Sequence, residues 1–76
     1  MTKNYYRSEY SDKQWKALID KATELSCQIT YSKYGNIVTI DSTALENSLV
    51  RDFPNSIVTV RQEWAERIHD MIQESS

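Results

Sequence analysis

Apolar residues recur at three- and four-residue intervals between positions 12 and 26, with polar residues between them. This spacing predicts an amphipathic helix. Ser11 stands at the expected N-cap, and Asp12 follows in the first turn, where the helix dipole favours an anion. The apolar face comprises Trp15, Leu18, Ile19, Ala22 and Leu25, and the opposite face carries Lys13, Lys16, Asp20 and Glu24.

The next segment is rich in β-branched residues and predicts a β-hairpin with strands at 27–32 and 37–41. Its connection holds Gly35, the only glycine of the chain, where a positive φ is expected. The expected cross-strand pairs are Ile29 with Ile40 and Tyr31 with Val38, all directed to the core. A slip by two residues would keep the same face, so the pattern specifies the face more firmly than the register.

Helix-capping residues follow the hairpin and predict a second helix over 43–53. Asp41, Ser42 and Thr43 are all good N-cap residues, and Thr43 to Glu46 fits a capping box. Pro54 ends this helix, because the residue before a proline disfavours the α region. The side chains expected to point inward are Leu45, Leu49 and Phe53.

Alternating β-branched residues at 56–61 predict a short strand, and 62–74 predicts a final helix. In the strand, Val58 and Val60 would face the helices, and Ile57 and Thr59 the other side of the sheet. The core side of the final helix would comprise Trp64, Ala65, Ile68, Met71 and Ile72.

Residues 1–10 leave two alternatives open, an edge strand or an extended arm. The expected fold class is α+β, with two layers: a small, mainly antiparallel sheet of three or four strands and helices on one face. If the leader is a strand, the order begins β-α-β-β-α-β, as in ferredoxin-like folds. Without it, the order is α-β-β-α-β-α.

The length of 76 residues predicts a single small domain spanning 1–76, near the lower limit for an independent core. One cysteine excludes an internal disulfide, and one histidine makes a zinc site improbable, so no metal or cofactor is expected. Cys27 is interpreted as a buried structural residue, and His69 as an exposed or boundary residue. Without a membrane-spanning run or a signal peptide, a cytoplasmic setting is expected, with no membrane partner.

The net charge of −2 is too small to indicate a nucleic-acid or membrane partner by itself. Its distribution is uneven, because the start of the chain is slightly basic and the end is acidic. Acidic residues of the final helix recur at three- and four-residue spacing: Glu63, Glu66, Asp70 and Glu74. They form either a docking face for a basic partner or an ordinary solvated helix face.

The second face of the predicted sheet carries no charge, which is unusual for an open sheet face. It is either an interface, covered by a second subunit, a partner protein or the chain's own leader, or a small neutral face left to water. The residues expected there include Ile37, Thr39, Ile57 and Thr59. Tyrosine and arginine are also over-used in recognition, which adds Tyr5, Tyr6, Arg7 and Tyr10 of the leader and Tyr34 at the hairpin tip as candidate contact residues.

No catalytic motif is recognisable, so the expected function is non-enzymatic. The leading hypothesis is a small protein-binding module, self-associating as a homodimer, that regulates or inhibits another protein, as phages and mobile elements often encode. The alternative is a role linked to nucleic acid. In one version the acidic helix imitates DNA and antagonises a DNA-binding protein; in the other the leader binds nucleic acid weakly, although it lacks the run of cations that phosphate contacts need.

Overall fold

The structure is a computed structural model that describes residues 1–52 and 58–75. Its elements follow one another as β1 (Thr2–Tyr6), a 3-10 turn (Arg7–Glu9), α1 (Asp12–Glu24), β2 (Gln28–Tyr31), β3 (Ile37–Asp41), α2 (Thr43–Asp52) and α3 (Val58–Glu74). The chain thus has the predicted α+β fold class.

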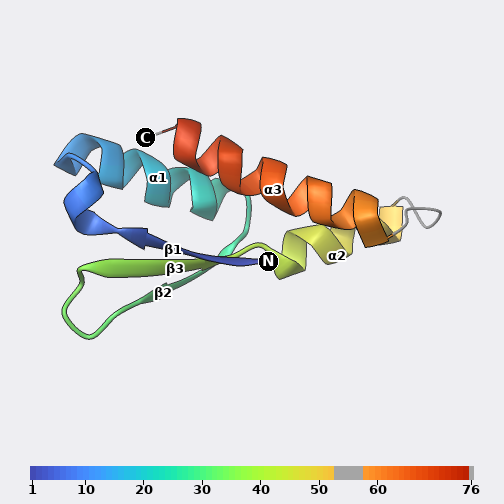
Figure 1. The fold of residues 1–76 in the computed structure, drawn as a ribbon, viewed down its shortest axis with the longest axis horizontal. Coiled ribbons are helices and arrows are strands. Elements are labelled where there is room, and N and C mark those ends of the chain that lie inside the picture. Colours follow the sequence, from blue (N-terminus) through green and yellow to red (C-terminus); the bar gives the residue numbers. More distant parts are fainter. Residues whose placement is uncertain (53–57, 76) are drawn as a thin grey trace.

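The strands form one antiparallel sheet in the order β1-β3-β2. Because β1 and β2 both run antiparallel to β3, they are parallel to each other, which is a split β-α-β arrangement. The hairpin register is the predicted one, with Ile29 opposite Ile40 and Tyr31 opposite Val38. Figure 1 shows α1 and α3 on one side of this sheet, and among the described residues no helix lies on the other side.

Both ends of α1 are fixed by local interactions. The Ser11 hydroxyl accepts from the Gln14 N–H, and the Gln14 side chain accepts from the Ser11 N–H, which completes a capping box. At the other end Ser26 has a φ of 59°. Its N–H donates to Thr23, and the Cys27 N–H donates to Ala22, so the helix closes with a Schellman motif.

The core lies between the sheet and the two helices that cover it. Val38 and Ile40 contribute from the central strand, Leu18 from α1 and Ile72 from α3, each of them 0% exposed. The remaining members of this buried cluster are Tyr5, Ala22, Cys27 and Ile68. Full burial of a side chain of this size stabilises the fold by about 1.5–3 kcal/mol.

The predicted strand over 56–61 is wrong for residues 58–61, which belong to α3. Extending an existing helix adds a hydrogen bond for each residue without a new nucleus, so the weak β preference of this short run is overridden. The ferredoxin-like order therefore does not arise, and Thr59 is not on the sheet. The predictions for Phe53, Pro54 and Ile57 lie outside the described residues.

Two residues predicted for the core lie at the surface. Tyr31 is 57% exposed although it has the expected register, because β2 is an edge strand and the helices cover the middle of the sheet. Met71 is 42% exposed because it lies at the margin of the buried side of α3. Periodicity identifies the face of an element but not how far its neighbours extend over that face.

The molecule is elongated, with dimensions of 40 × 23 × 19 Å. The sheet, α1 and the second half of α3 form the wide part, which we call the body. Figure 1 shows α2 and the first half of α3 extending past the end of the sheet, and we call this helix pair the arm.

Candidate functional site

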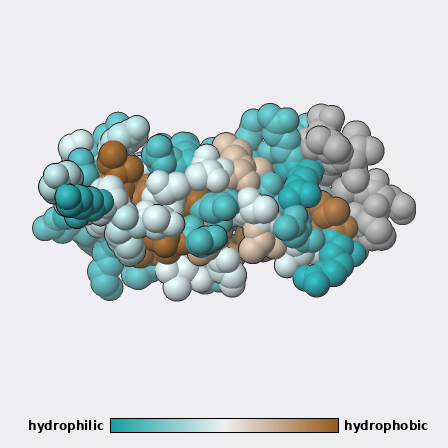
Figure 2. Space-filling view, turned by 90° about the horizontal axis from the view of Figure 1, so that it is seen from below, coloured by the Kyte–Doolittle hydropathy of each residue, from teal (hydrophilic) through white to brown (hydrophobic). Residues whose placement is uncertain are grey.

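The uncovered side of the sheet is a regular surface of the body, formed by all three strands. The register places its outward-facing residues in three cross-strand rows: Thr2–Asp41–Gln28, Asn4–Thr39–Thr30 and Tyr6–Ile37–Ser32. We call this surface the open face. Figure 2 views the molecule from this side and shows mostly pale and teal residues with small brown areas.

The prediction of a face without charge is wrong at one corner, because the three rows of the open face include one charged side chain, Asp41. Its carboxylate accepts hydrogen bonds from the main-chain N–H and the hydroxyl of Thr43, and these bonds lower the pKa of Asp41. In the middle row, the Thr39 hydroxyl donates to the Asn4 side chain at 2.8 Å. The centre of the face is therefore neutral and already internally hydrogen-bonded.

One end of the open face is more apolar. Tyr6 is 45% exposed and lies opposite the half-buried Ile37 in the register. Beyond them the hairpin tip presents Tyr34, which is 83% exposed and has the Lys33 ammonium 5.7 Å from its ring centre. Tyr6 and Ile37 thus form an apolar end of an otherwise polar face, and Tyr34 lies in the hairpin turn, outside the three rows.

Residues 2–6 of the leader form β1, which is an edge strand of the sheet and not an extended arm. Tyr5 points into the core and is 2% exposed. The expectation that Tyr5 is a contact residue at the surface is therefore wrong. Tyr10 is half-buried, with its ring centre 6.0 Å from that of Trp15. Arg7 forms an ion pair with Asp12 and lies over the Trp15 ring. Of the candidate contact residues in the leader, Tyr6 is the most exposed.

The acidic residues of the last helix are all exposed on α3: Glu63, Glu66, Asp70 and Glu74. Within the described parts of the chain, none of the four is in an ion pair. The sequence correctly predicted this acidic stripe as a surface feature.

His69 differs most from its prediction, because it is 1% exposed instead of lying at the surface. The Tyr5 hydroxyl lies 3.0 Å from His69 Nδ1, and the main-chain oxygen of Met1 lies 3.2 Å from His69 Nε2. A neutral imidazole with its proton on Nε2 satisfies both contacts, since Nε2–H donates to Met1 and Nδ1 accepts from Tyr5. Burial lowers the pKa of His69 and keeps it in this neutral form.

The same buried cluster continues to the start of α2. The Ser42 hydroxyl donates to the Glu46 carboxylate at 2.6 Å and lies 3.3 Å from His69 Nε2. Glu46 also contacts the Met1 ammonium and has Arg61 Nε at 3.6 Å. Burial acts to raise the pKa of Glu46, but the hydrogen bonds from Met1 and Ser42 outweigh it, and the pKa is lowered.

This buried polar cluster joins three elements that are distant in the sequence: β1, the start of α2, and α3. Ser42 is 0% exposed, so its contact with His69 is closed to a substrate in this structure. The predicted capping box from Thr43 to Glu46 is wrong, because Glu46 turns to Ser42 and Met1 instead. Sequence spacing contained a signal for the buried histidine, since positions 65, 68, 69 and 72 share one helix face.

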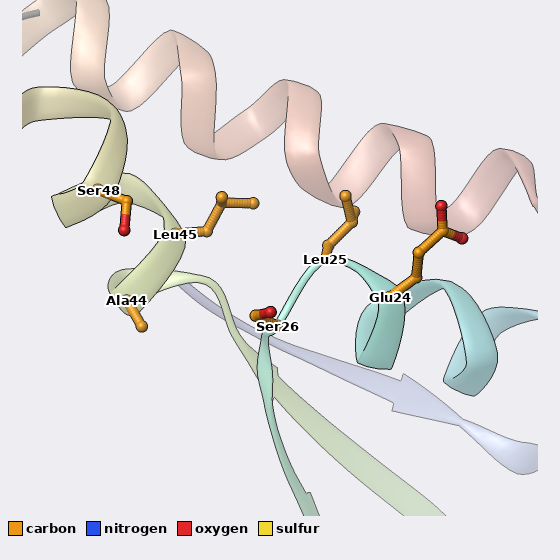
Figure 3. Close-up of a pocket in the computed structure, with 6 residues that line it drawn as sticks. All are labelled: Glu24, Leu25, Ser26, Ala44, Leu45 and Ser48. Carbon is orange, nitrogen blue, oxygen red and sulfur yellow. The ribbon is translucent and has the colours of Figure 1, made fainter. Parts of the chain in front are cut away.

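Shallow hollows lie where the body meets the arm. Figure 3 shows one of about 320 Å³ between the end of α1 and α2, lined by Glu24, Leu25, Ser26, Ala44, Leu45 and Ser48. Another, of about 430 Å³, lies between α2 and α3 and is lined by Leu49, Trp64, Arg67, Ile68 and Met71. Neither contains a pair of side chains arranged for acid–base or nucleophilic chemistry.

Cys27 is buried, as predicted, and burial raises the pKa of its thiol. Among the described residues, no three His, Cys, Asp or Glu side chains are placed to hold a metal ion. In the same parts of the chain, no helix is long and apolar enough to cross a membrane. Comparisons with protein-family models, curated proteins and solved structures found no match.

Proposed function

We propose that this protein is a non-enzymatic binding module that contacts another protein through the open face of its sheet. The neutrality of that face carries the proposal. Exposed sheet faces normally carry Lys, Arg or Glu, which keep them in water and prevent association, whereas the only charge here is the capping carboxylate of Asp41. The setting we propose is cytoplasmic, since Cys27 is a free thiol.

The chemistry of the face favours a different protein over a second copy packed face to face. Homodimer interfaces are more apolar than the average surface, whereas non-obligate interfaces are about as polar as the rest of the surface. The middle row offers the hydroxyl and amide groups of Asn4, Thr30 and Thr39, and Tyr6 offers an aromatic anchor beside Ile37. The partner we expect is uncharged at the contact and has a recess for Tyr6.

A second candidate function rests on the acidic stripe of α3. Four exposed carboxylates on one helix, none of them in an ion pair within the described residues, would attract a basic surface, such as the DNA-binding side of another protein. This antagonist role would leave the open face unused, so the two candidates predict different sensitive residues.

Affinity capture from the native host with matched variants separates them. A partner that is retained by wild type and by Glu66→Lys/Asp70→Lys, but lost by Tyr6→Glu and by Thr39→Glu, supports the open face. The reverse pattern supports the acidic stripe. Tyr34→Glu at the hairpin tip is the matched control for Tyr6→Glu, and circular dichroism verifies that each variant is folded. A partner that tolerates all the face variants would exclude the open face as its contact.

A further inference from the structure

The two edges of the sheet differ in how they are protected against further pairing. Edge strands expose unpaired main-chain groups, and proteins block them with charged residues, prolines or bulges. On β1 the blocking residue is Lys3, which lies over the Tyr5 ring and donates to Gln73 of α3. The other edge, β2, reads Gln28-Ile29-Thr30-Tyr31 and has no charge, proline or glycine.

The register shows which main-chain groups of β2 point outward. Ser32 N–H donates to the Ile37 carbonyl at 3.0 Å, so the even-numbered residues of β2 pair with β3. The N–H and C=O groups of Ile29 and Tyr31 therefore face away from the sheet. Within the described residues, no hydrogen bond to these four groups is found.

We infer that the β2 edge pairs antiparallel with the β2 edge of a second copy of this chain, across a two-fold axis at Thr30. This register places Ile29 opposite Tyr31 of the second copy, so that each pair can exchange both of its main-chain hydrogen bonds. Because the two-fold repeats the arrangement, all four outward groups of each chain are satisfied. A two-fold axis at Ile29 would require the Cys27 N–H, which already donates to Ala22, and an axis at Tyr31 would require main-chain groups of Lys33, which lies in the hairpin turn and not in the strand.

Side chains on the helix side of β2 fit this pairing. Tyr31 is 57% exposed, and its ring would lie against the half-buried Ile29 of the second copy, an aromatic–β-branched cross-strand pair. This contact would cover Tyr31, which was predicted for the core but is left exposed by the helices.

The charges of α1 are complementary under the same symmetry. α1 packs against β2 and lies along the sheet, so the two copies of α1 run antiparallel on one side of the joined sheet (Figure 1). Its first half carries Lys13 and Lys16 against Asp12, a net charge of +1, and its second half carries Asp20 and Glu24 against Lys21, a net charge of −1. Within the helix, Lys16 pairs with Asp20 and Lys21 with Glu24. The two-fold axis would bring the basic half of each helix towards the acidic half of the other.

The joined sheet would place the open faces of two copies side by side, as one surface for the proposed partner. The edge pairing itself does not require that the proposed function is correct. A Tyr31→Lys monomer that still captures the partner would separate the two claims.

The edge itself is tested by sedimentation across micromolar to millimolar concentrations, with Tyr34→Lys as the matched control. Tyr31→Lys should weaken dimerisation by at least about tenfold, whereas the control should leave it unchanged.

Cysteine cross-linking tests the register on folded protein. Thr30 would lie opposite its copy in a non-hydrogen-bonded pair, about 4.5 Å between Cα atoms, which is within disulfide range. Thr39, beside it on the same face, would lie about 14 Å from its copy across three strand spacings. Thr30→Cys should therefore form a disulfide-linked dimer under mild oxidation, whereas Thr39→Cys and wild type should not.

Hydrogen exchange supplies a readout that needs no substitution. The amide protons of Ile29 and Tyr31 should exchange more slowly as concentration rises, whereas those of Asn4 and Tyr6, which face outward from the β1 edge, should not change. A wild type that is monomeric at all these concentrations would overturn the inference. A dimer with unchanged Ile29 and Tyr31 exchange and no Thr30→Cys cross-link would also overturn it, because its interface would lie elsewhere.

Discussion

The body and the arm bury their side chains to very different degrees. In the body a sheet and two helices enclose Leu18, Val38, Ile40 and Ile72, all 0% exposed. In α2, which forms half of the arm, Glu46 is the one buried residue, and Leu45 and Leu49 are partly buried against the core. A pair of helices alone cannot enclose a core, so the arm depends on the body for its stability.

The largest expected effect is a contrast between the two regions. Ile40→Ala, in the central strand, should lower the free energy of unfolding by about 3 kcal/mol, because it leaves a cavity that the surrounding strands cannot fill. Leu49→Ala in the arm should cost about 1 kcal/mol, because its side chain is only partly removed from water. Urea unfolding of both variants measures the difference, and equal losses would mean that the arm is as tightly packed as the body.

The next effect compares two adjacent tyrosines. Tyr5→Phe removes the hydroxyl 3.0 Å from the buried His69 Nδ1 and should cost about 1–3 kcal/mol, the usual penalty for leaving a buried acceptor unsatisfied. Tyr6→Phe on the open face should change stability by less than about 0.5 kcal/mol. Chemical denaturation of the two variants provides the comparison, and a neutral Tyr5→Phe would show that the buried cluster contributes little.

The pH dependence of stability follows from the neutral state of His69. Burial holds its folded pKa below the ordinary value of 6.5, so the unfolded chain binds a proton first as the pH falls below that value. The contribution of neutral His69 to the free energy of unfolding should therefore be fully present above about pH 6.5. It should be lost as the pH falls from 6.5 towards the lower pKa of the folded state. The lowered pKa of Glu46 adds a second loss, which begins near 4.5.

The urea midpoint, followed from about pH 7.5 to about pH 5.5, measures the histidine contribution. His69→Gln should flatten this part of the profile even if it lowers stability throughout, because glutamine does not titrate. A profile that keeps the wild-type slope in His69→Gln would assign the pH dependence to another group.

The smallest effect lies at the junction of the body and the arm. Ser26 has a φ of 59°, a conformation that glycine adopts more readily than serine. Ser26→Gly should therefore raise the free energy of unfolding by about 0.5–1 kcal/mol. Gly35→Ala is the converse control, since its φ of 70° disfavours a side chain, and it should lower stability by a similar amount. Thermal unfolding of both proteins tests the pair.

Local patterns in the sequence were sufficient where neighbouring residues decide the structure. The Ser11 cap, the apolar side of α1 and the hairpin register were all predicted, because each depends on residues close together in the chain. The four acidic residues of α3 were also correctly predicted to be exposed. The same reasoning failed at residues 58–61, where β-branched residues continue a helix.

The sequence by itself determined the α+β class, the predicted face of each hairpin strand and the nearly uncharged composition of the open face. Only the tertiary structure decided which members of those faces are buried, because burial depends on how far α1 and α3 extend over the sheet. It buried His69 and Tyr5 together although they are 64 residues apart, and it left Tyr31 exposed at an unprotected edge. Contacts between distant segments leave little periodic signal, so the buried cluster and the edge became visible only in the folded chain.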